Sequence, residues 1–510
     1  MNQNTIPMKY LNAFIVLFCL MESCQFKQKA MNPEQTAEDR YQSVYHFTPP
    51  SNWMNDPNGM VYYAGEYHLF YQHFPDSNVW GPMHWGHAVS QDMIHWEHLP
   101  IALYPDSLGF IFSGSAVVDY DNTTGFGSEL NPAMVSIFTY SNQQEEFEGS
   151  ITFQNQAVAY SLDSGRTWTK YAGNPVLSNP GIKDFRDPKV TWMEEFEKWV
   201  MILAVKDHVS IYSSKNLLDW THESDFGKDE GAHGGVWECP DLFRIQDDQG
   251  NWKWVMLVSI NPGGYQGGSG TQYFVGEFDG REFSTNQKEV KWIDYGADNY
   301  AGVLWSNIPD SDGRKLFIGW MSNWAYANKV SLVDRRNMMT IPREVSLRRK
   351  ENDHVLAMVP IRELDHIGVL NTSGDLTELE KGMRTNEAYQ LDLQIESMEG
   401  KFELVFSSED KDSLFLSVSH NEHIVDRSKC GNVSLATMFS RQHKASLDGI
   451  RNLSIFLDRS SIEVFANDGE VNMTDLFFTR SPLQQVQMVT SEAEIEARFE
   501  YRKIEVKEPI

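Results

Sequence analysis

Residues 161–168 read SLDSGRTW: a Ser at the end of a strand-like segment, a polar turn and a Trp. The same plan returns as SQDMIHW at residues 90–96 and as SKNLLDW at residues 214–220. Each copy follows a short apolar run and is separated from the next by the length of one four-stranded unit. Repetition at such a spacing is typical of β-propellers, whose blades are four-stranded antiparallel sheets. The repeat therefore predicts a propeller of roughly five blades over residues 42–345.

The C-terminal part of the chain has a different texture. Trp is absent after Trp324, and short alternating runs such as Leu453–Leu457 and Ile462–Phe465 follow one another, separated by turn residues. Helical periodicity is scarce throughout, so we predict an all-β fold in which residues 365–510 form a β-sandwich. The charged stretch at residues 346–364 is expected to be a linker between the two domains.

The composition of the 510 residues excludes several classes of protein. Lys and Arg number 43 against 71 Asp and Glu, a formal net charge of −28, which repels nucleic acid and anionic lipid. A hydrophobic content of 41% and an aromatic content of 13% exclude a disordered chain. The net charge therefore predicts no nucleic-acid partner. The aromatic content predicts clefts lined by flat rings, which suit sugars.

The first 24 residues are typical of a secretory signal peptide. The apolar run Leu11–Met21 is too short to span a bilayer as a helix. Cys24 follows this run and a small residue, as in the lipobox of bacterial lipoproteins, so we expect lipidation at Cys24, with ordinary secretion as the alternative. Residues 25–41 are expected to be a polar linker. The mature protein would then be extracytoplasmic, at the cell surface or in the periplasm, with a lipid anchor as its only contact with a membrane. The two remaining cysteines, Cys239 and Cys430, are too few for a disulfide framework.

Three acidic residues lie in unusually dense local contexts. Asp56 occurs in WMNDPNG from residue 53, Asp187 in FRDP from residue 185 and Glu238 in WECP from residue 237. A single Asp before such a turn most often caps it. Three acids on separate predicted blades, each followed closely by Pro, instead favour one shared central site.

Paired carboxylates are what glycoside hydrolysis requires. One protonates the leaving oxygen, and the other, ionised, attacks or stabilises the sugar cation. Glu238 is flanked in the sequence by a Trp and a Cys, apolar neighbours that favour its protonated form. Asp56 has the amides of Asn55 and Asn58 nearby as hydrogen-bond donors, which favour its charged form. The sequence thus predicts Glu238 as the acid.

Taken together, the three motifs resemble the signatures of glycoside hydrolase family 32, the fructan hydrolase and invertase family. Further matches are HWGH at residues 84–87, FSGS at residues 112–115 and GWM at residues 319–321, and the similarity extends from about residue 44 to beyond residue 480. The resemblance implies a five-bladed β-propeller followed by a β-sandwich, and it implies no cofactor.

The resemblance also implies residue roles. Asp56 would be the nucleophile, Glu238 the acid/base and Asp187 the transition-state stabiliser that binds sugar hydroxyls. The fructose subsite would be lined by Trp53, Asn55, Gln72, Trp80, Phe112, Ser113, Arg186 and Trp320. Asn299 stands where the family often has Phe, at a position expected on the outer rim. The expected reaction is hydrolysis of β-fructofuranosidic bonds in levan or inulin, with retention through a covalent fructosyl-enzyme.

Other sites and functions are weaker alternatives. His84 and His87 are three residues apart and would point to opposite faces of a strand, so no metal site is expected. The Gly-rich segment at residues 262–270 lacks the ending of a phosphate-binding loop and is expected to be a flexible hairpin at the rim. Residues 161–168 match the Asp-box turn of sialidases, but those enzymes need an arginine cluster and a Tyr nucleophile. A sucrose-preferring invertase, a fructosyltransferase and a non-catalytic fructan-binding protein remain open.

Overall fold

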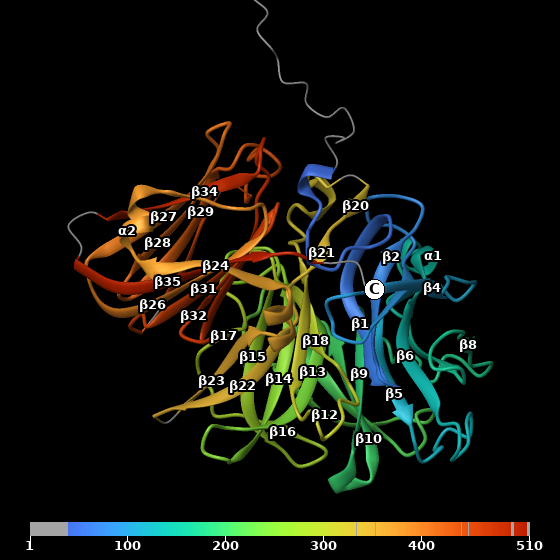
Figure 1. Cartoon of the computed structure of the whole chain (residues 1–510). Helices are drawn as coiled ribbons and strands as arrows, with labels where there is room; N and C mark the ends of the chain where they lie inside the picture. Colours follow the sequence, from blue (N-terminus) through green and yellow to red (C-terminus); the bar gives the residue numbers. More distant parts are fainter. Residues whose placement is uncertain are drawn as a thin grey trace, which may run out of the picture.

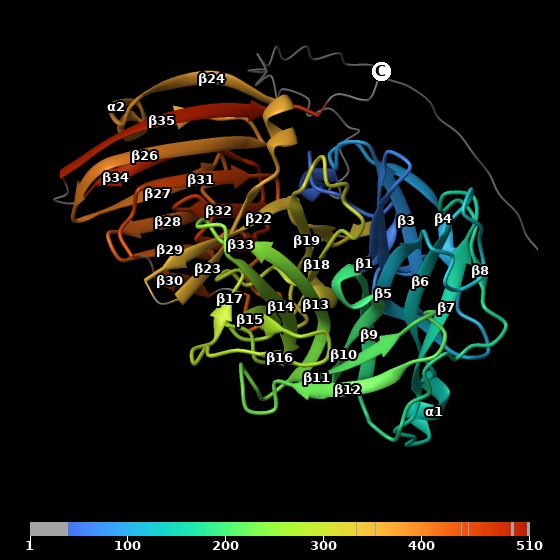
Figure 2. The same ribbon diagram turned by 90° about the horizontal axis from the view of Figure 1, so that it is seen from below.

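The computed structural model describes residues 39–332, 334–351, 353–439, 441–446, 448–490 and 494–506. The expected signal peptide, the lipidation site Cys24 and all but the end of the expected polar linker lie outside the described residues. The fold is almost entirely β, as predicted: a propeller of five blades is followed by a sandwich of two sheets (Figure 1, Figure 2). Within the described segments, no helix is long and apolar enough to cross a membrane.

Each blade is an antiparallel sheet whose strands follow one another in chain order. Blade 1 consists of β1 (Asn52–Tyr63), β2 (Glu66–Phe74), β3 (His84–Ser90) and β4 (Glu97–Leu103). Blade 2 consists of β5 (Phe110–Asp119), β6 (Ala133–Ser141), β7 (Gln154–Ser161) and β8 (Thr169–Lys170). Blade 3 consists of β9 (Phe185–Met193), β10 (Lys198–Val205), β11 (His208–Ser214) and β12 (Thr221–Phe226).

The last two blades carry short additional strands. Blade 4 consists of β13 (Val236–Gln246), β14 (Trp252–Asn261), β15 (Gly270–Phe278) and β16 (Phe283–Ser284), with β17 (Lys291–Trp292) on β15. Blade 5 consists of β18 (Tyr300–Leu304), β19 (Lys315–Met321), β22 (Arg343–Lys350) and β23 (Asp353–Pro360), with β21 (Met338–Met339) on β19. The short helices are η1 (Asp39–Tyr41), α1 (Gln143–Phe147), η2 (Glu194–Phe196), η3 (Ala327–Lys329), η4 (Arg362–His366) and α2 (Thr377–Lys381).

The first strands of the blades form a closed ring. β1 contacts β5, β5 contacts β9, β9 contacts β13, β13 contacts β18, and β18 contacts β1 again. The ring is also closed by β20 (Arg335–Arg336), which comes from the chain after β19 and pairs in parallel with the start of β1. The five inner strands therefore surround one axis, and residues at equal heights on them can meet.

The three sequence repeats form the same turn, between the third and fourth strands of blades 1, 2 and 3. In residues 161–168 the Gly165 amide donates to Ser161 Oγ at 2.9 Å, and Trp168 Nε1 donates to the Gly165 carbonyl at 2.9 Å. The corresponding bonds in the other copies join Met93 to Ser90, Trp96 to Met93, Leu217 to Ser214 and Trp220 to Leu217. The Ser fixes the turn and the Trp anchors its end, so each repeat marks one blade.

The prediction of a linker at residues 346–364 is wrong. Most of this stretch forms β22 and β23, the outer strands of blade 5, and the 3-10 helix η4 follows them before the sandwich begins. Val345, Leu347, Leu356 and Met358 are buried in one cluster between blades 4 and 5. The charged residues alternate with them on the other face, and this alternation resembled a charged linker in the sequence.

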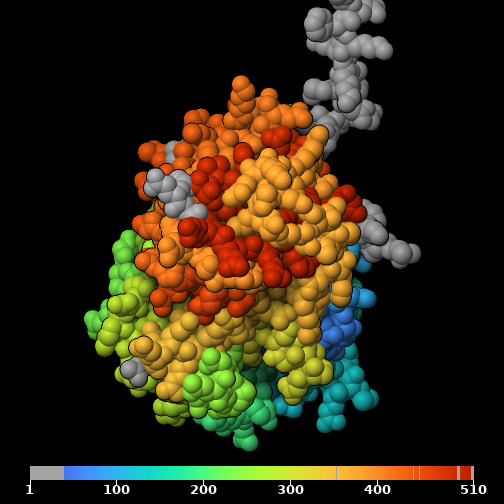
Figure 3. Space-filling view, turned by 60° about the vertical axis from the view of Figure 1, so that its left-hand side comes forward, coloured from blue at the N-terminus to red at the C-terminus, as the bar shows by residue number. Residues whose placement is uncertain are grey.

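The sandwich consists of two six-stranded sheets, as predicted from the alternating runs. One sheet contains β24 (Gly368–Asp375), β35 (Glu494–Ile504), β26 (Tyr389–Glu399), β31 (Asn452–Leu457), β32 (Ser461–Ala466) and β33 (Val471–Leu476). The other contains β25 (Met383–Arg384), β34 (Leu483–Thr490), β27 (Lys401–Ser408), β28 (Ser413–Ser419), β29 (Glu422–Lys429) and β30 (Gln442–Ser446). Figure 3 shows these orange and red sheets lying directly against the yellow and green blades.

A buried network of charges joins the sandwich to the propeller. Arg343 donates to Glu463 at 2.6 Å and to Asp294 at 3.0 Å, and none of these three side chains is more than 3% exposed. His46 lies between Asp458 and Glu463, with nitrogen–oxygen distances of 2.8 and 2.9 Å. Loss of one partner would leave a buried charge uncompensated, which is strongly destabilising. The network therefore holds the two domains in one fixed arrangement.

Candidate active site

The three acids of the sequence motifs meet at one end of the propeller axis. Asp56 lies on β1, Asp187 on β9 and Glu238 on β13, each within the first five residues of its strand. Because the inner strands form a ring, these equal positions bring the three carboxyl groups from blades 1, 3 and 4 together. The shared central site expected from the sequence is thus present in the geometry.

The pairing of each of the three inner strands that carry an acid is interrupted by a bulge beside that acid. The pairing of β1 with β2 shifts between Asn55 and Pro57, and that of β13 with β14 shifts between Glu238 and Asp241. On β9 the shift falls opposite Asp187, which has a φ of 63°. Pro lacks the amide proton that a regular ladder needs, so the Pro in each motif is compatible with a bulge. The bulges turn the acidic side chains toward the axis.

Asp56 is held by donors on its own strand and on blade 2. Ser113 Oγ donates to Asp56 Oδ2 at 3.0 Å, while the other oxygen, Oδ1, is buried without a hydrogen-bond partner among the residues that the structure describes. Burial, followed by the proximity of Glu238, raises the pKa of Asp56, and hydrogen bonds from Asn55 and Ser113 oppose that rise. The expected amide donor Asn58 instead bonds the backbone carbonyl of Asp56 at 3.2 Å.

Asp187 is more enclosed than Glu238: its side chain is 6% exposed, against 20% for that of Glu238. Its Oδ2 accepts from the Cys239 amide at 3.1 Å, and its own amide donates to Thr139 Oγ1 at 3.1 Å. Burial raises the pKa of Asp187 to about 7; Arg186 opposes this rise, and Glu238 and Asp56 add to it. The acids therefore form one electrostatically coupled group.

Glu238 has polar partners, contrary to the apolar surroundings inferred from its neighbours in the sequence. Arg186 Nη2 donates to Glu238 Oε1 at 2.8 Å, and the Tyr300 hydroxyl donates to Oε2. The flanking side chains have other partners: Trp237 Nε1 donates to the Ala232 carbonyl at 2.9 Å, and Cys239 Sγ lies 3.7 Å from Oδ2 of Asp56. Trp237 is fully buried in the cluster between blades 3 and 4.

Cys239 lies between two acids and not simply beside Glu238. Its Sγ is 3.7 Å from Oδ2 of Asp56 and 3.7 Å from Oδ2 of Asp187. Burial, together with these anionic neighbours, raises the pKa of the thiol well above its ordinary value. The side chain therefore stays a neutral thiol that can donate a weak hydrogen bond, and it is not an activated nucleophile.

Polar and aromatic side chains from blades 1 and 2 accompany the acids. Asn55 and Gln72 are paired opposite each other on β1 and β2 and are 2% and 1% exposed. Within the described part of the chain, Gln72 Nε2 is buried without a hydrogen-bond partner. Trp80, by contrast, is 36% exposed and contacts the Phe112 ring edge-on at 6.3 Å. The amides offer hydrogen-bonding groups inside the site, and Trp80 offers an open aromatic surface at its edge.

Trp53 and Trp320, expected to line the sugar subsite, are fully buried. Trp53 donates to Asn55 Oδ1 at 2.7 Å, and its ring stacks on Trp324 with centroids 5.9 Å apart. Trp320 contacts both Trp53 and Tyr300 with its ring. These rings thus back the residues of the site, and the partly buried Trp324, which the sequence motifs did not indicate, is the outermost of the three tryptophans.

Two residues near β18 differ from expectation. Tyr300, which bonds Glu238, was not singled out from the sequence, although it lies at the end of the DYGADNY segment. Asn299, expected at the outer rim, is 4% exposed and donates to Asp294 Oδ2 at 3.1 Å. Its place is therefore in the buried network that joins the two domains.

The Gly-rich loop between β14 and β15 is tied to both domains. Gln266 Nε2 donates to the Tyr295 carbonyl at 2.7 Å and to the Lys444 carbonyl of the sandwich at 3.0 Å. Asn323 Nδ2 donates to the Gly267 carbonyl at 3.3 Å. The loop does connect two antiparallel strands as the expected hairpin, but hydrogen bonds to both domains hold it at the interface, whereas a flexible loop was expected from its glycines.

Nearly all of the described chain matches one family of known proteins. Residues 46–360 match the Glycosyl hydrolases family 32 N-terminal domain, and residues 362–508 match the Glycosyl hydrolases family 32 C terminal domain. A levanase of Bacillus subtilis (strain 168) is 47% identical over 488 residues, which cover 92% of this chain and 71% of the levanase. An extracellular exo-inulinase of Aspergillus awamori is 38% identical over 497 residues, covering 86% of this chain and 90% of the inulinase.

Solved structures give the same result. The exo-inulinase from Aspergillus awamori has a TM-score of 0.83 and 33% identity, covering 93% of this chain and 99% of the inulinase. A β-fructofuranosidase from Schwanniomyces occidentalis, complexed with fructosyl-erythritol, has a TM-score of 0.82 and 30% identity, covering 92% and 99% of the two chains. With both domains matched and the levanase nearly half identical, this chain belongs to glycoside hydrolase family 32 and is a glycoside hydrolase.

Proposed function

We propose that the protein hydrolyses β-fructofuranosidic bonds of fructans, levan or inulin, with retention of configuration through a covalent fructosyl-enzyme. The observation that carries this proposal is the convergence of Asp56, Asp187 and Glu238 from three blades onto one site, in a family whose relatives include a levanase and exo-inulinases. Retaining glycosidases use one carboxylate as nucleophile and a second carboxyl group as acid and then base.

In the first step Asp56 forms a bond to the anomeric carbon while the bond to the leaving oxygen breaks. Glu238 transfers its proton to that oxygen, so the remainder of the fructan leaves as an alcohol. In the second step Glu238 takes a proton from water, and the resulting oxygen attacks the same carbon and releases Asp56. The enzyme returns to its starting protonation state, and one water is consumed for each bond cleaved.

The contacts of Glu238 suit this exchange of roles. Arg186 and Tyr300 donate to its two oxygens and so stabilise the carboxylate that remains after the proton has been transferred. A tyrosine hydroxyl can also accept a hydrogen bond, so Tyr300 remains a partner when Glu238 is protonated. Both contacts fix the direction of the carboxyl group toward the leaving oxygen.

Asp187 is assigned to the sugar hydroxyls. Its Oδ2 is already engaged by the Cys239 amide, which leaves the rest of the carboxyl group to accept hydrogen bonds from substrate. Contacts that tighten as the sugar ring flattens lower the barrier without taking part in bond exchange. Trp80, exposed at the edge, offers a ring surface to the substrate.

A polymeric substrate also agrees with the expected secretion of the protein. Polymers must be cut before uptake, and several relatives are named as extracellular enzymes. The proposed lipid anchor at Cys24 would keep such an enzyme at the cell.

Incubation with levan, inulin and sucrose, followed by chromatography of the products, tests the proposal. The Asp56→Asn variant, which keeps the side-chain size but lacks the nucleophile, is the control. We expect the wild-type protein to release fructose or short fructans from at least one of the two polymers, and Asp56→Asn to release none. Cleavage of sucrose alone would identify an invertase, and products longer than the substrate would identify a transferase. Binding of levan without cleavage by the wild-type protein would overturn the assignment as a hydrolase.

A further inference from the structure

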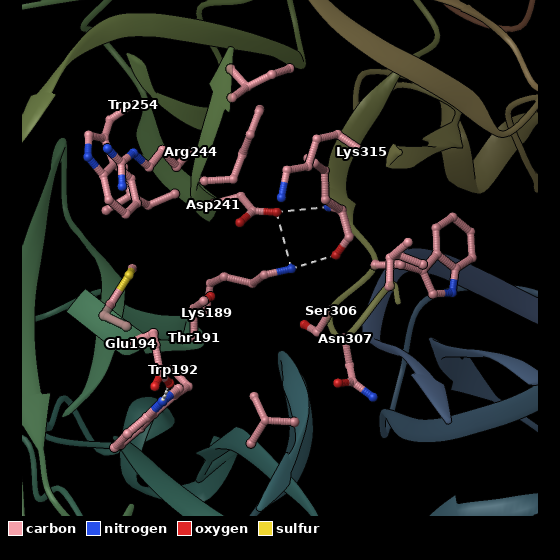
Figure 4. A pocket seen from close by; sticks show the side chains of 18 of the residues that line it. Lys189, Thr191, Trp192, Glu194, Asp241, Arg244, Trp254, Ser306, Asn307 and Lys315 are labelled. Atoms are coloured by element: carbon pink, nitrogen blue, oxygen red, sulfur yellow. Dashed lines mark hydrogen bonds and ion pairs between the residues drawn. The ribbon is translucent and has the colours of Figure 1, made fainter. Parts of the chain in front are cut away.

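The inner strands that carry Asp187, Glu238 and Tyr300 are joined a second time, beyond the acids. Lys189 Nζ on β9 donates to the Leu304 carbonyl on β18 at 2.6 Å and lies 3.1 Å from Asp241 Oδ2 on β13. The same oxygen of Asp241 accepts from the Leu304 amide at 2.8 Å. These three groups form a closed set of contacts across blades 3, 4 and 5, which we call the clasp (Figure 4).

The clasp lies on the far side of the bulges from the acids. Lys189 follows Asp187 by two residues, and Asp241 follows Glu238 by three, so each lies where the regular strand pairing resumes beyond the bulge. Its groups also line a cavity of about 850 Å³, together with Trp192, Trp254 and Lys315 among others. The clasp is therefore part of the wall of this cavity, on the far side of the bulges from the acids.

The clasp removes two charged groups from water, which costs free energy. Lys189 is 7% and Asp241 1% exposed, so both charges are almost completely removed from water. Buried ion pairs often contribute no more stability than apolar side chains of the same size would. Stability alone thus does not explain a Lys and an Asp at these positions.

The bulges suggest another reason for a Lys and an Asp at positions 189 and 241. At the acids the regular pairing of β9 and β13 with their neighbouring strands is interrupted, so a regular ladder does not by itself hold the side chains that the bulges turn toward the axis. Immediately after each interruption, the hydrogen bonds and the ion pair of the clasp set the distances between β9, β13 and β18. We propose that Lys189 and Asp241 are positioning residues that fix Asp187 and Glu238 relative to Tyr300, an assignment that rests on the proposed catalytic roles of those acids.

Single variants give the first part of the test. Lys189→Met removes the donor to Leu304 and leaves Asp241 buried without its cation. We expect kcat on levan to fall about 100-fold with KM little changed, since a misplacement of about 1 Å has such an effect on turnover. Lys198→Met is the matched control, because Lys198 on β10 pairs with Glu223 on β12 of the same blade, and neither residue lies on the inner strand β9. Its kcat should stay close to that of the wild type.

The double variant Lys189→Met/Asp241→Leu separates positioning from stability. Apolar side chains of similar size remove both buried charges at once, so the melting temperature should recover relative to Lys189→Met. The strand-to-strand bonds stay absent, so kcat should stay low. A folded double variant with wild-type kcat would overturn the proposal.

Asp241→Asn keeps the test decisive if the double variant fails to fold. The amide retains an acceptor oxygen but not the charge that attracts Lys189, and we expect an intermediate loss of kcat with unchanged KM. Wild-type kcat in folded Asp241→Asn would overturn the proposal equally. Failure of the proposed function is recognisable separately, because then the wild-type protein itself would not cleave levan or inulin.

Discussion

Arg186 donates a 2.8 Å hydrogen bond from Nη2 to Oε1 of Glu238 and so joins blade 3 to blade 4 at the centre of the site. The other terminal nitrogen of the same guanidinium bonds Asp184 at 2.8 Å. A planar group with donors in a fixed fork can hold both carboxylates at once. The position of Glu238 thus depends on a residue 52 positions away from it, on the preceding blade.

This relationship predicts the effect of Arg186→Lys. A lysine keeps the charge but has a single ammonium, which cannot reach Asp184 and Glu238 in the same geometry. We expect kcat on a fructan to fall about 100-fold, in line with the effect of small misplacements, while the fold is retained. Steady-state kinetics with circular dichroism measure both quantities. Wild-type turnover in Arg186→Lys would show that the fork geometry is unnecessary.

Asp187→Asn is predicted to change the dependence of stability on pH. The pKa of Asp187 is about 7 in the folded protein against an ordinary value of 3.8, so the folded state holds this proton more tightly than the unfolded state. Stability from this group is then lost as the pH rises from about 4 to about 7. The variant cannot ionise, so its melting temperature should match that of the wild type near pH 4 and exceed it at pH 8.

Asp225→Asn is the control for that measurement. Hydrogen bonds from Lys228, Ser210 and His222 outweigh partial burial and hold the pKa of Asp225 well below its ordinary value. Its charged form contributes stability above pH 4, and this is lost as the pH falls. The control should therefore have a lower melting temperature than the wild type at pH 8. Equal shifts in both variants would contradict the assignment for Asp187.

His46→Gln tests the buried network between the domains. Burial opposes the charge on His46, but hydrogen bonds to Asp458 and Glu463 prevail and raise its pKa to about 9, from 6.5. The stabilising contribution is fully present below pH 6.5 and is lost as the pH rises through 9. We expect the melting temperature of the wild type to fall between pH 6.5 and pH 9.5, and that of the variant to be lower at pH 6.5 and flatter. A parallel decline in both proteins would rule out this role of His46.

The fold and the acids could be predicted because local sequence determines them. The Ser-to-Trp turns are closed by bonds within eight residues, so each copy is visible as a motif and counts one blade. Asp56, Asp187 and Glu238 stand out because a following Pro marks the bulge that turns them inward. Their meeting at one point follows once the blades are known to form a ring.

The remaining features depend on contacts between distant residues. Tyr300 reaches Glu238 across 62 positions, and Gln266 ties the Gly-rich loop to a sandwich carbonyl 178 positions away. Nothing near these residues in the sequence indicates such partners. The linker was mistaken for the same reason, because the apolar residues of β22 and β23 are buried against another blade. Sequence neighbours likewise gave the wrong surroundings for Glu238, whose partners come from β9 and β18.

The central claim is that Asp56 attacks the sugar and Glu238 protonates the leaving group, and hydrolysis of two substrates by two variants tests it most directly. Asp56→Ala and Glu238→Ala should each be assayed on levan and on a nitrophenyl fructoside, whose leaving group departs without a proton donor. Asp56→Ala should lose both activities, because no covalent intermediate can form. Glu238→Ala should lose levan hydrolysis and retain formation of nitrophenolate. Retained cleavage of the aryl fructoside by Asp56→Ala, with its loss in Glu238→Ala, would contradict the account and exchange the two roles.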